Sequence, residues 1–405
     1  MVLIEYYTER HIENISTCLR LKPEKLYLVG TAEEAATPLN RYKAILKKRK
    51  LKTKAELYDV VGADFEELYR SFTTLLAPKE QYVVDLSGGD ATAVMALGAV
   101  YANLPQEKQK DIQILRYDED LENLIDCLHD NKPLPQEPVY LTVKELIQLH
   151  GGVVLPNSDQ PSRTFSAKQL EPLWEMASDP KTEWNQNLAT LIQFQSYNTH
   201  EDGILLELDS LVGKISDFSD KEQQLRSFLK KLDKKGIIED HSSFDYLEYS
   251  YTDPVYRYCL EKAGNVLEMK VLLEARELQV NGKPYFNDCH MSVSIDWDGV
   301  LYPNRKRAET RNEIDVVLMR GMIPTFISCK NGTIEEVELY KLYTVAERFG
   351  GPHVQKLLLA TNPGAVSRAT SQRAWDMDVL LVSDIATMSR QDWRYLFTHI
   401  EEELP

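Results

Sequence analysis

The stretch 81–101, QYVVDLSGGDATAVMALGAVY, decides the fold of the N-terminal part of this chain. A short apolar run over residues 82–86 leads directly into Ser87-Gly88-Gly89-Asp90, and a helical pattern follows over residues 91–103. A strand, a tight turn and a helix form the repeating unit of a parallel sheet, because parallel strands need a crossover connection, which is usually a helix. We therefore expect an α/β domain around this stretch.

The same alternation extends over residues 1–120. Strands are expected at residues 2–7, 26–30, 57–61, 82–86 and 112–117, and helices at residues 11–21, 39–50, 65–76 and 91–103. This order predicts a parallel, doubly wound sheet with helices on both faces, which is a Rossmann-like domain.

The glycine loop after residue 86 has two interpretations. Gly88 and Gly89 let the backbone approach a ligand closely, and the following helix start presents free N–H groups to an anion such as phosphate. The loop could equally be a tight turn with Asp90 as the helix N-cap. It lacks both G-x-G-x-x-G and the P-loop G-K-[ST], which disfavours a dinucleotide redox cofactor and an NTP hydrolase.

Other polar residues are expected at the same edge of the sheet. Ligands bind at the carboxyl ends of the strands in open α/β sheets. Thr8 and Glu9 follow the first predicted strand, and Thr31 follows the second. These three residues should line the rim together with the glycine loop.

The remainder of the chain divides into two further regions. Residues 131–139 and 150–163 are rich in Pro, Gly and Ser and predict loops or linkers. Helices are expected at residues 167–177 and 184–197, and an amphipathic helix with Gly236 at its C-cap precedes a strand, as in a winged helix. We expect boundaries at 1–140 for the first domain, 141–250 for linker and helical segments, and 251–405 for a C-terminal domain.

Charged residues interrupt the apolar strands of the stretch 312–332, NEIDVVLMRGMIPTFISCKNG. Residues two apart in a strand share a face. Glu313 therefore lies beside Asp315, and Ser328 beside Lys330. The opposite faces are largely apolar and should pack into the core.

A hairpin should bring the two charged faces together. A turn at residues 320–321 would pair Met319 with Met322 and leave Asp315 on the face of the polar residues of the second strand. Pro324 cannot donate to the ladder, so we expect the second strand to begin just after it.

Glu268 is a third candidate for this site. In the stretch 263–277, AGNVLEMKVLLEARE, it lies on a largely apolar helix face, where a carboxylate is costly unless it is paired or bound to a metal. Glu268 and Asp315 could hold Mg²⁺ or Mn²⁺, and Lys330 could orient a water or neutralise phosphate charge. A buried ion pair of Lys330 with either acid, without chemistry, is the alternative.

These motifs resemble the PD-(D/E)xK restriction-endonuclease superfamily, which has a helical Glu, then an Asp on one strand, then [D/E]-x-K on the next. GNVLEMK, NEIDVV and FISCKNG look like that core in nucleases that carry an N-terminal CARF domain, the CRISPR-associated Rossmann fold. The loop DLSGG at residues 85–89 resembles the CARF ligand loop. The resemblance implies a homodimeric accessory effector of type III CRISPR immunity. In that family a cyclic oligoadenylate, usually cyclic tetra-adenylate, switches on metal-dependent cleavage of DNA, RNA or both.

The resemblance also implies roles for single residues. Glu268, Asp315 and Lys330 would be catalytic, with Glu268 and Asp315 as metal ligands. The pocket for the cyclic oligoadenylate would include Thr8, Glu9, Thr31, Asp85, Ser87, Gly88, Gly89 and Asp90. One position departs from the family pattern, because Ser328 stands where a second carboxylate is usual and serine is a poor ligand for a hard cation. Glu313, about 7 Å along the strand from Asp315, or the backbone carbonyl of Cys329, would complete the metal site.

Composition limits the other functional classes. With 405 residues and 43% hydrophobic content, the chain is long enough for two or three domains, and no apolar run approaches the ~18 residues that span a bilayer. We expect a cytoplasmic protein with no membrane contact. A formal net charge of −16 argues against a protein that coats nucleic acid. A local patch with Arg305, Lys306 and Arg307 could still hold the phosphate backbone of a substrate.

The sequence therefore predicts a cyclic-oligoadenylate-activated, metal-dependent nuclease that acts as a homodimer. Two other functions stay open. One is a ligand-sensing CARF transcriptional regulator whose nuclease site is degenerate through Ser328. The other is a constitutive repair or restriction endonuclease in which the first domain is only a scaffold.

Overall fold

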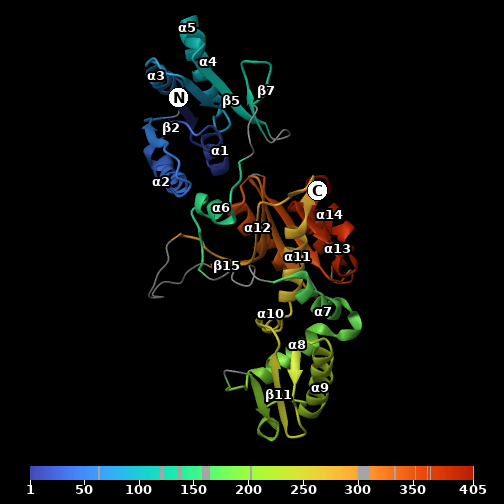
Figure 1. Cartoon of the computed structure of the whole chain (residues 1–405). Helices are drawn as coiled ribbons and strands as arrows, with labels where there is room; N and C mark the ends of the chain where they lie inside the picture. The colour runs from blue at the N-terminus through green and yellow to red at the C-terminus, as the bar shows by residue number, and fades with distance from the viewer. Residues whose placement is uncertain are drawn as a thin grey trace.

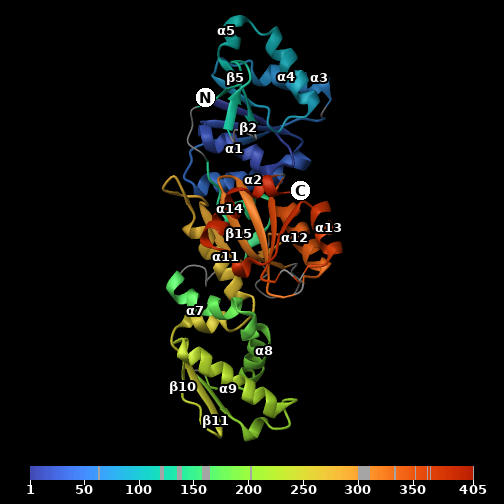
Figure 2. The same cartoon turned by 90° about the vertical axis from the view of Figure 1, so that its right-hand side faces the viewer.

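The computed structural model describes residues 1–62, 64–118, 123–134, 139–156, 165–200, 203–299, 311–332, 334–351, 353–362, 364 and 366–404. Three parts follow one another along the molecule (Figures 1 and 2). The C-terminal unit lies in the middle, with the N-terminal unit on one side and the segment that carries α8 and α9 on the other. The predicted α/β fold class is confirmed by the two large mixed sheets described below.

The N-terminal unit is built on a seven-stranded sheet with the order β3-β2-β1-β4-β5-β6-β7. Its parallel strands are β1 (Val2–Tyr6), β2 (Lys25–Gly30), β3 (Lys54–Asp59), β4 (Tyr82–Asp85) and β5 (Ile112–Asp118), and β6 (Asn123–Asp126) and β7 (Lys132–Pro133) are antiparallel. The strand order reverses between β1 and β4, which is where open α/β sheets bind ligands.

Helices cover both faces of this sheet. They are α1 (His11–Leu21), α2 (Ala32–Lys48), α3 (Phe65–Leu75), α4 (Ala91–Asn103) and the short α5 (Gln106–Gln109). Successive residues of β1 point to opposite faces, so Leu3 packs with α1 and α2 whereas Ile4 packs with α3 and α4. The prediction that the second helix begins at residue 39 is wrong. The Thr31 hydroxyl accepts a hydrogen bond from the Glu34 N–H and starts α2 at Ala32.

The C-terminal unit contains a six-stranded sheet with the order β18-β17-β16-β15-β14-β8. Its strands are β8 (Val153–Val154), β14 (Asp288–Asp296), β15 (Arg311–Arg320), β16 (Ile323–Lys330), β17 (Gln355–Ala360) and β18 (Val379–Val382). The helices of this unit are α10 (Pro254–Cys259), α11 (Asn265–Glu277), α12 (Glu336–Phe349), α13 (Arg368–Asp376), α14 (Arg390–Thr398) and α15 (Ile400–Glu403), and β12 (Gln279–Val280) with β13 (Lys283–Pro284) forms a small hairpin. The edge strand β8 comes from a segment that the sequence predicted as a linker.

The register of the β15–β16 hairpin differs from the predicted one by two residues. Arg320 pairs with Ile323 and Met319 pairs with Pro324, so the turn lies at residues 321–322 and the predicted pairing of Met319 with Met322 is wrong. Side chains alternate with a period of two, so this shift leaves the charged residues on the predicted face. Pro324 lies within β16, not before it. β17 pairs with β16 only from Thr325 onward, so the missing N–H of Pro324 costs no bond to β17.

The segment between the two sheets forms a third, smaller unit. It contains α7 (Ala167–Ser178), α8 (Trp184–Gln195), β9 (Ile204–Glu207), α9 (Phe218–Lys234), β10 (Ile238–Asp240) and β11 (Tyr246–Tyr251). The helix before it, α6 (Val143–Leu149), lies between the N-terminal and C-terminal units instead. The last three strands form an antiparallel sheet with the order β10-β11-β9. The C-cap of α9 is Lys235, and Gly236 follows it with a φ of +69°. In the part of the chain that the structure describes, no helix has both the length and the apolar character needed to cross a membrane.

Helix α6 joins the N-terminal unit to the C-terminal unit. Its apolar residues belong to one core cluster with α1, α2, β14 and α12. A bidentate ion pair fixes the contact, because Arg49 at the end of α2 donates from Nε and Nη2 to the two carboxylate oxygens of Glu145, at 3.0 and 2.6 Å. The Glu145 side chain is only 4% exposed, so this pair is held largely out of water.

Replacing Arg49 should destabilise the chain more than replacing an exposed arginine. Arg49→Ala leaves the buried Glu145 carboxylate without its guanidinium partner, and we expect a loss of about 2–3 kcal/mol in the free energy of unfolding. Arg70→Ala removes an exposed pair with Glu66 and should cost less than about 0.5 kcal/mol. Urea unfolding of both variants measures the difference. Equal losses would contradict the assignment of this contact as a structural link.

Candidate functional site

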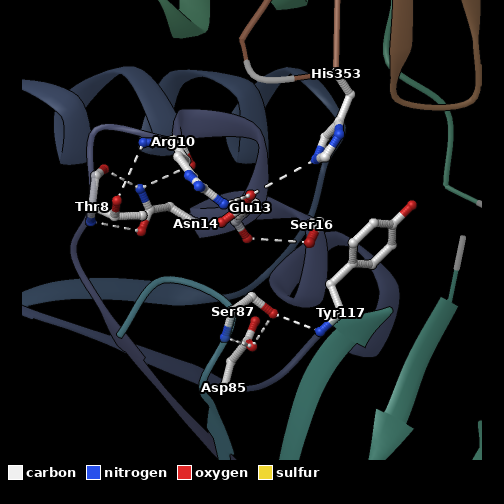
Figure 3. Close-up of polar contacts among 9 residues, drawn as sticks. All are labelled: Thr8, Arg10, Glu13, Asn14, Ser16, Asp85, Ser87, Tyr117 and His353. Carbon is white, nitrogen blue, oxygen red and sulfur yellow. Dashed lines mark hydrogen bonds and ion pairs between the residues drawn. The ribbon is translucent and has the colours of Figure 1, made fainter. Parts of the chain in front are cut away.

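The predicted ligand rim is formed by two adjacent loops of the N-terminal sheet. One follows β1 and carries Thr8, and the other follows β4 and carries Ser87 and the two glycines (Figure 3). The Asn14 amide holds the first loop, because it donates to the Thr8 carbonyl at 2.5 Å while its oxygen accepts from the Thr8 N–H at 3.2 Å. Asn14 is one turn into α1, and sequence reasoning did not identify it.

Gly88 is required by the close approach of these two loops. A Cβ atom at this position would lie 2.6 Å from the Tyr6 carbonyl oxygen and 2.9 Å from Thr8 Cγ2. The same atom at Gly89 would meet nothing closer than Val94 Cγ2 at 3.4 Å, which is an ordinary contact. Close packing therefore explains Gly88 and does not explain Gly89.

Asp85 supports the loop from below. Its carboxylate is buried and accepts a hydrogen bond from the Thr17 hydroxyl. It also accepts from the Ser87 N–H at 2.8 Å and from the Ser87 hydroxyl at 2.6 Å (Figure 3). The Ser87 oxygen in turn accepts from the Tyr117 N–H at 2.8 Å. Burial raises the pKa of Asp85 despite these donors. The structure thus places Asp85 under the rim, with its side chain engaged by the protein.

The remaining predicted rim residues are at helix starts or on the surface. Asp90 caps α4 by accepting from the Ala93 N–H at 2.7 Å, and Thr31 caps α2. Glu9 is exposed between Thr8 and α1. Because the Asp90 carboxylate occupies the start of α4, this helix end is less suited to a phosphate than the sequence suggested. The exposed Arg10 at the start of α1 supplies positive charge that sequence reasoning missed.

Helix α1 connects this rim to the C-terminal unit. Glu13 accepts from Arg10 Nη1 at 3.1 Å, and the same carboxylate oxygen lies 3.9 Å from His353 Nε2 (Figure 3). A cavity of about 760 Å³ lies between the two units at this contact, lined by Glu13, Lys356 and residues of α12 and β17.

The predicted charged residues of the C-terminal unit line one cavity. This cavity has a volume of about 370 Å³, and its lining includes Glu268, Glu313, Asp315, Ser328 and Lys330. Helix α11 supplies the first of these residues and the β15–β16 hairpin supplies the rest. The convergence that the spacing predicted is therefore present.

The two central carboxylates carry raised pKa values. Burial, reinforced by the charge of Asp315, raises the pKa of Glu268 to about 8. Burial also raises the pKa of Asp315, although its Oδ2 accepts from the Cys329 N–H at 2.6 Å and from the Ser328 hydroxyl at 3.2 Å. Two carboxylates that repel one another in a shared cavity are a feature of cation sites.

Ser328 acts as a donor to Asp315 instead of supplying a carboxylate. Continuing the hairpin register places it directly across from Asp315. Glu313 lies further out, is half-exposed and faces Lys262 at 3.8 Å. Glu313 is one of the residues that line the cavity, whereas Cys329 is not, although its neighbours Ser328 and Lys330 are.

Lys330 has a partner that the sequence motif did not reveal. Its Nζ lies 2.7 Å from Glu338 Oε2, and Glu338 also accepts from Lys341 at 2.8 Å. Burial disfavours the charged lysine, but Glu338 and Asp315 outweigh it, so the pKa of Lys330 is raised. Glu338 sits in the first turn of α12, eight residues after Lys330 in the chain, and only the fold brings it into the cavity lining.

The donor set fits a hard divalent cation of the Mg²⁺ type. Carboxylate and carbonyl oxygens are its preferred ligands, and Mg²⁺ is commonly bound through one or two carboxylates while it keeps several waters. Within the described ranges, no three His, Cys, Asp or Glu side chains are grouped closely enough to hold a metal ion. Residues 305–307, the predicted nucleic-acid contacts, lie outside the described residues.

Gly88→Ala should strain the rim, whereas Gly89→Ala should not. The added methyl group must displace the Tyr6 carbonyl or the Thr8 loop, so we expect a loss of about 1–3 kcal/mol in the free energy of unfolding. Denaturant unfolding of the two alanine variants provides the comparison. A Gly88→Ala variant as stable as Gly89→Ala would show that the two loops do not approach closely.

Glu268→Gln should change the pH dependence of stability in metal-free buffer. The pKa of Glu268 is raised from an ordinary value near 4.5 to about 8, so between these values the folded state holds a proton that the unfolded state releases. Wild-type stability should therefore fall as pH rises from about 5 to 8, and the neutral glutamine should remove this loss. Thermal unfolding in EDTA at pH 5, 6, 7 and 8 measures it, with Glu274→Gln on the same helix as control. Parallel profiles for wild type and Glu268→Gln would refute the assignment.

Comparison with known proteins gives a likeness in structure only. No protein-family model matches the chain, and no curated protein matches it. Protein VC1899 from Vibrio cholerae aligns with a TM-score of 0.73 at 17% identity, over 99% of this chain and 97% of that chain. Can2 from Sulfobacillus thermosulfidooxidans, solved in complex with cyclic tetra-adenylate, aligns with a TM-score of 0.66 at 16% identity, over 98% of this chain and 99% of that chain. The chain therefore has the fold of these two proteins along nearly its whole length, and this likeness agrees with the predicted α/β fold class.

Proposed function

We propose that this chain is a metal-dependent nuclease of type III CRISPR defence that a cyclic oligoadenylate activates. The observation that carries the proposal is the convergence of Glu268, Asp315 and Lys330 on one cavity. Two buried carboxyl groups beside a protonated lysine would lower the stability of a purely structural core. In the hydrolysis of a phosphodiester, by contrast, all three groups have a role. The fold shared with Can2, which was solved with cyclic tetra-adenylate, supports the activator class.

In this proposal each residue of the cavity has a separate task. Glu268 and Asp315 would hold Mg²⁺ or Mn²⁺, with Glu313 or the carbonyl of Cys329 nearby. The bound ion would supply an activated water and polarise a phosphoryl oxygen. Lys330, kept protonated by Glu338, would place positive charge beside the phosphate.

The activator would bind at the rim between the β1 and β4 loops. Thr8, Ser87, Gly88 and Gly89 would approach the ring, and Arg10 would face its phosphates. We propose a homodimer, because two identical rims related by a two-fold axis suit a ring-shaped ligand of repeated units. Helix α1 begins at this rim, and its Glu13 side chain lies near His353 of the C-terminal unit. Binding of the activator would therefore act on the C-terminal sheet through α1.

The catalytic assignment predicts that Asp315→Ala abolishes cleavage. Even changes outside the ligand shell of a metal typically cost 10–100-fold, so loss of this carboxylate should reduce the rate by more than about 100-fold. The measurement is cleavage of supercoiled plasmid and of labelled single-stranded RNA, with Mg²⁺ or Mn²⁺, with and without cyclic tetra-adenylate. Cutting that needs both metal and activator is the expected result for wild type.

Other outcomes would favour the alternatives. Cutting that ignores the activator would indicate a constitutive endonuclease. Tight binding of cyclic tetra-adenylate without cutting of either substrate, under both metals, would favour a ligand-sensing regulator in which Ser328 marks an inactive site.

A further inference from the structure

Ser292 adopts a backbone conformation that serine rarely takes within a strand. Its φ is +49°, in the left-handed region, although it lies in the middle of β14. Such outliers persist only where the surrounding structure holds them, and they gather at functional sites. The flanking residues Met291 and Val293 are fully buried and keep the register with Val316 and Ile314. The pairing register is the same on both sides of Ser292, but Met291 and Val293 belong to different core clusters, so the regular alternation of side chains is interrupted at this residue.

This residue contacts one of the carboxyl groups that line the cavity. Because Met291 pairs with Val316 and Val293 with Ile314, Ser292 stands across from Asp315. Its hydroxyl donates to Glu268 Oε2 at 3.1 Å. The distorted residue thus contacts one candidate metal ligand and lies opposite the other.

A second hydroxyl extends this contact. Tyr258, in α10, has its phenolic oxygen 3.1 Å from Ser292 Oγ. Its ring is partly buried against the core cluster that contains α11. A rigid aromatic residue from one element and a distorted serine from another therefore fix one oxygen of Glu268.

We propose that Ser292, supported by Tyr258, is a positioning residue that orients Glu268 for the divalent cation. The inference rests on the proposed function and assigns no direct contact with substrate to either residue. Outer partners of metal ligands commonly set ligand orientation, and their loss costs 10–100-fold in metal affinity or activity. A serine with an ordinary strand φ would direct its side chain differently, which gives the unusual backbone a physical reason.

Two substitutions of Ser292 separate the effect of losing the hydroxyl group from the effect of backbone strain. Ser292→Ala and Ser292→Gly both remove the donor to Glu268, but glycine accepts a positive φ without steric cost and alanine does not. We expect the glycine variant to melt about 2 °C above the alanine variant. Both variants should lose cleavage equally, by about 10–100-fold in kcat, with KM for the nucleic acid unchanged. Ser250→Ala, in the distant strand β11, is the matched control and should change neither quantity.

Metal affinity supplies a readout that does not depend on cleavage. Calorimetric titration of Mn²⁺ into the full-length chain should show a 10–100-fold weaker dissociation constant for Ser292→Ala than for wild type. Tyr258→Phe should show a smaller loss, and Tyr258→Phe added to Ser292→Ala should cause no further loss, because the phenol acts through the serine.

The outcomes distinguish this inference from the proposed function. If wild type cuts, Asp315→Ala does not, and Ser292→Ala cuts and binds Mn²⁺ like wild type, the positioning role is overturned and the nuclease remains. If wild type binds Mn²⁺ but cuts nothing, the proposed function fails, and the affinities of the Ser292 variants still decide the inference. Absence of Mn²⁺ binding by wild type would overturn both.

Discussion

Two carboxyl groups held out of water are the constraint on which the C-terminal unit depends. Glu268 and Asp315 enter one cavity from a helix and from a strand, and burial raises the pKa of both. The groups around them act against this cost: Ser292 donates to Glu268, and the Cys329 N–H and Ser328 hydroxyl donate to Asp315. Without a bound cation, two carboxyl groups buried in this way lower the stability of the folded state. A cation that binds them would raise that stability, because the free energy of metal binding adds to the free energy of folding.

The replacement of a carboxylate by Ser328 alters how charge is distributed in the site. Ser328 donates a hydrogen bond to Asp315, so it would support this residue in the proposed role of metal ligand. A negative charge is still present beside Lys330, supplied by Glu338 from helix α12. The lysine therefore lies between Asp315 and Glu338, which together keep it protonated despite its partial burial.

The two candidate sites are joined by a continuous series of contacts. Helix α1 starts at the rim, where Asn14 holds the Thr8 loop, and its Glu13 carboxylate lies 3.9 Å from His353. Strand β17 begins two residues after His353 and pairs in parallel with β16, which ends at Lys330. Because α1, α6 and the C-terminal sheet share one apolar core cluster, a displacement of α1 would shift side chains that pack against that sheet.

The sequence by itself determined the alternation of strands and helices, the polar face of the β15–β16 hairpin and the three residues Glu268, Asp315 and Lys330, because these follow from local periodicity. It did not determine the hairpin register, the start of α2 at Ala32 or the strand β8, since these depend on hydrogen bonds and strand pairings that form only in the folded chain. Only the tertiary structure decided that Asp85 braces the rim from below, that Glu338 reaches Lys330, and that Ser292 takes a left-handed conformation beside Glu268. The physical reason is that these contacts depend on how separate elements pack against one another, as α12 does against β16 and α11 against β14, and no local pattern encodes that packing.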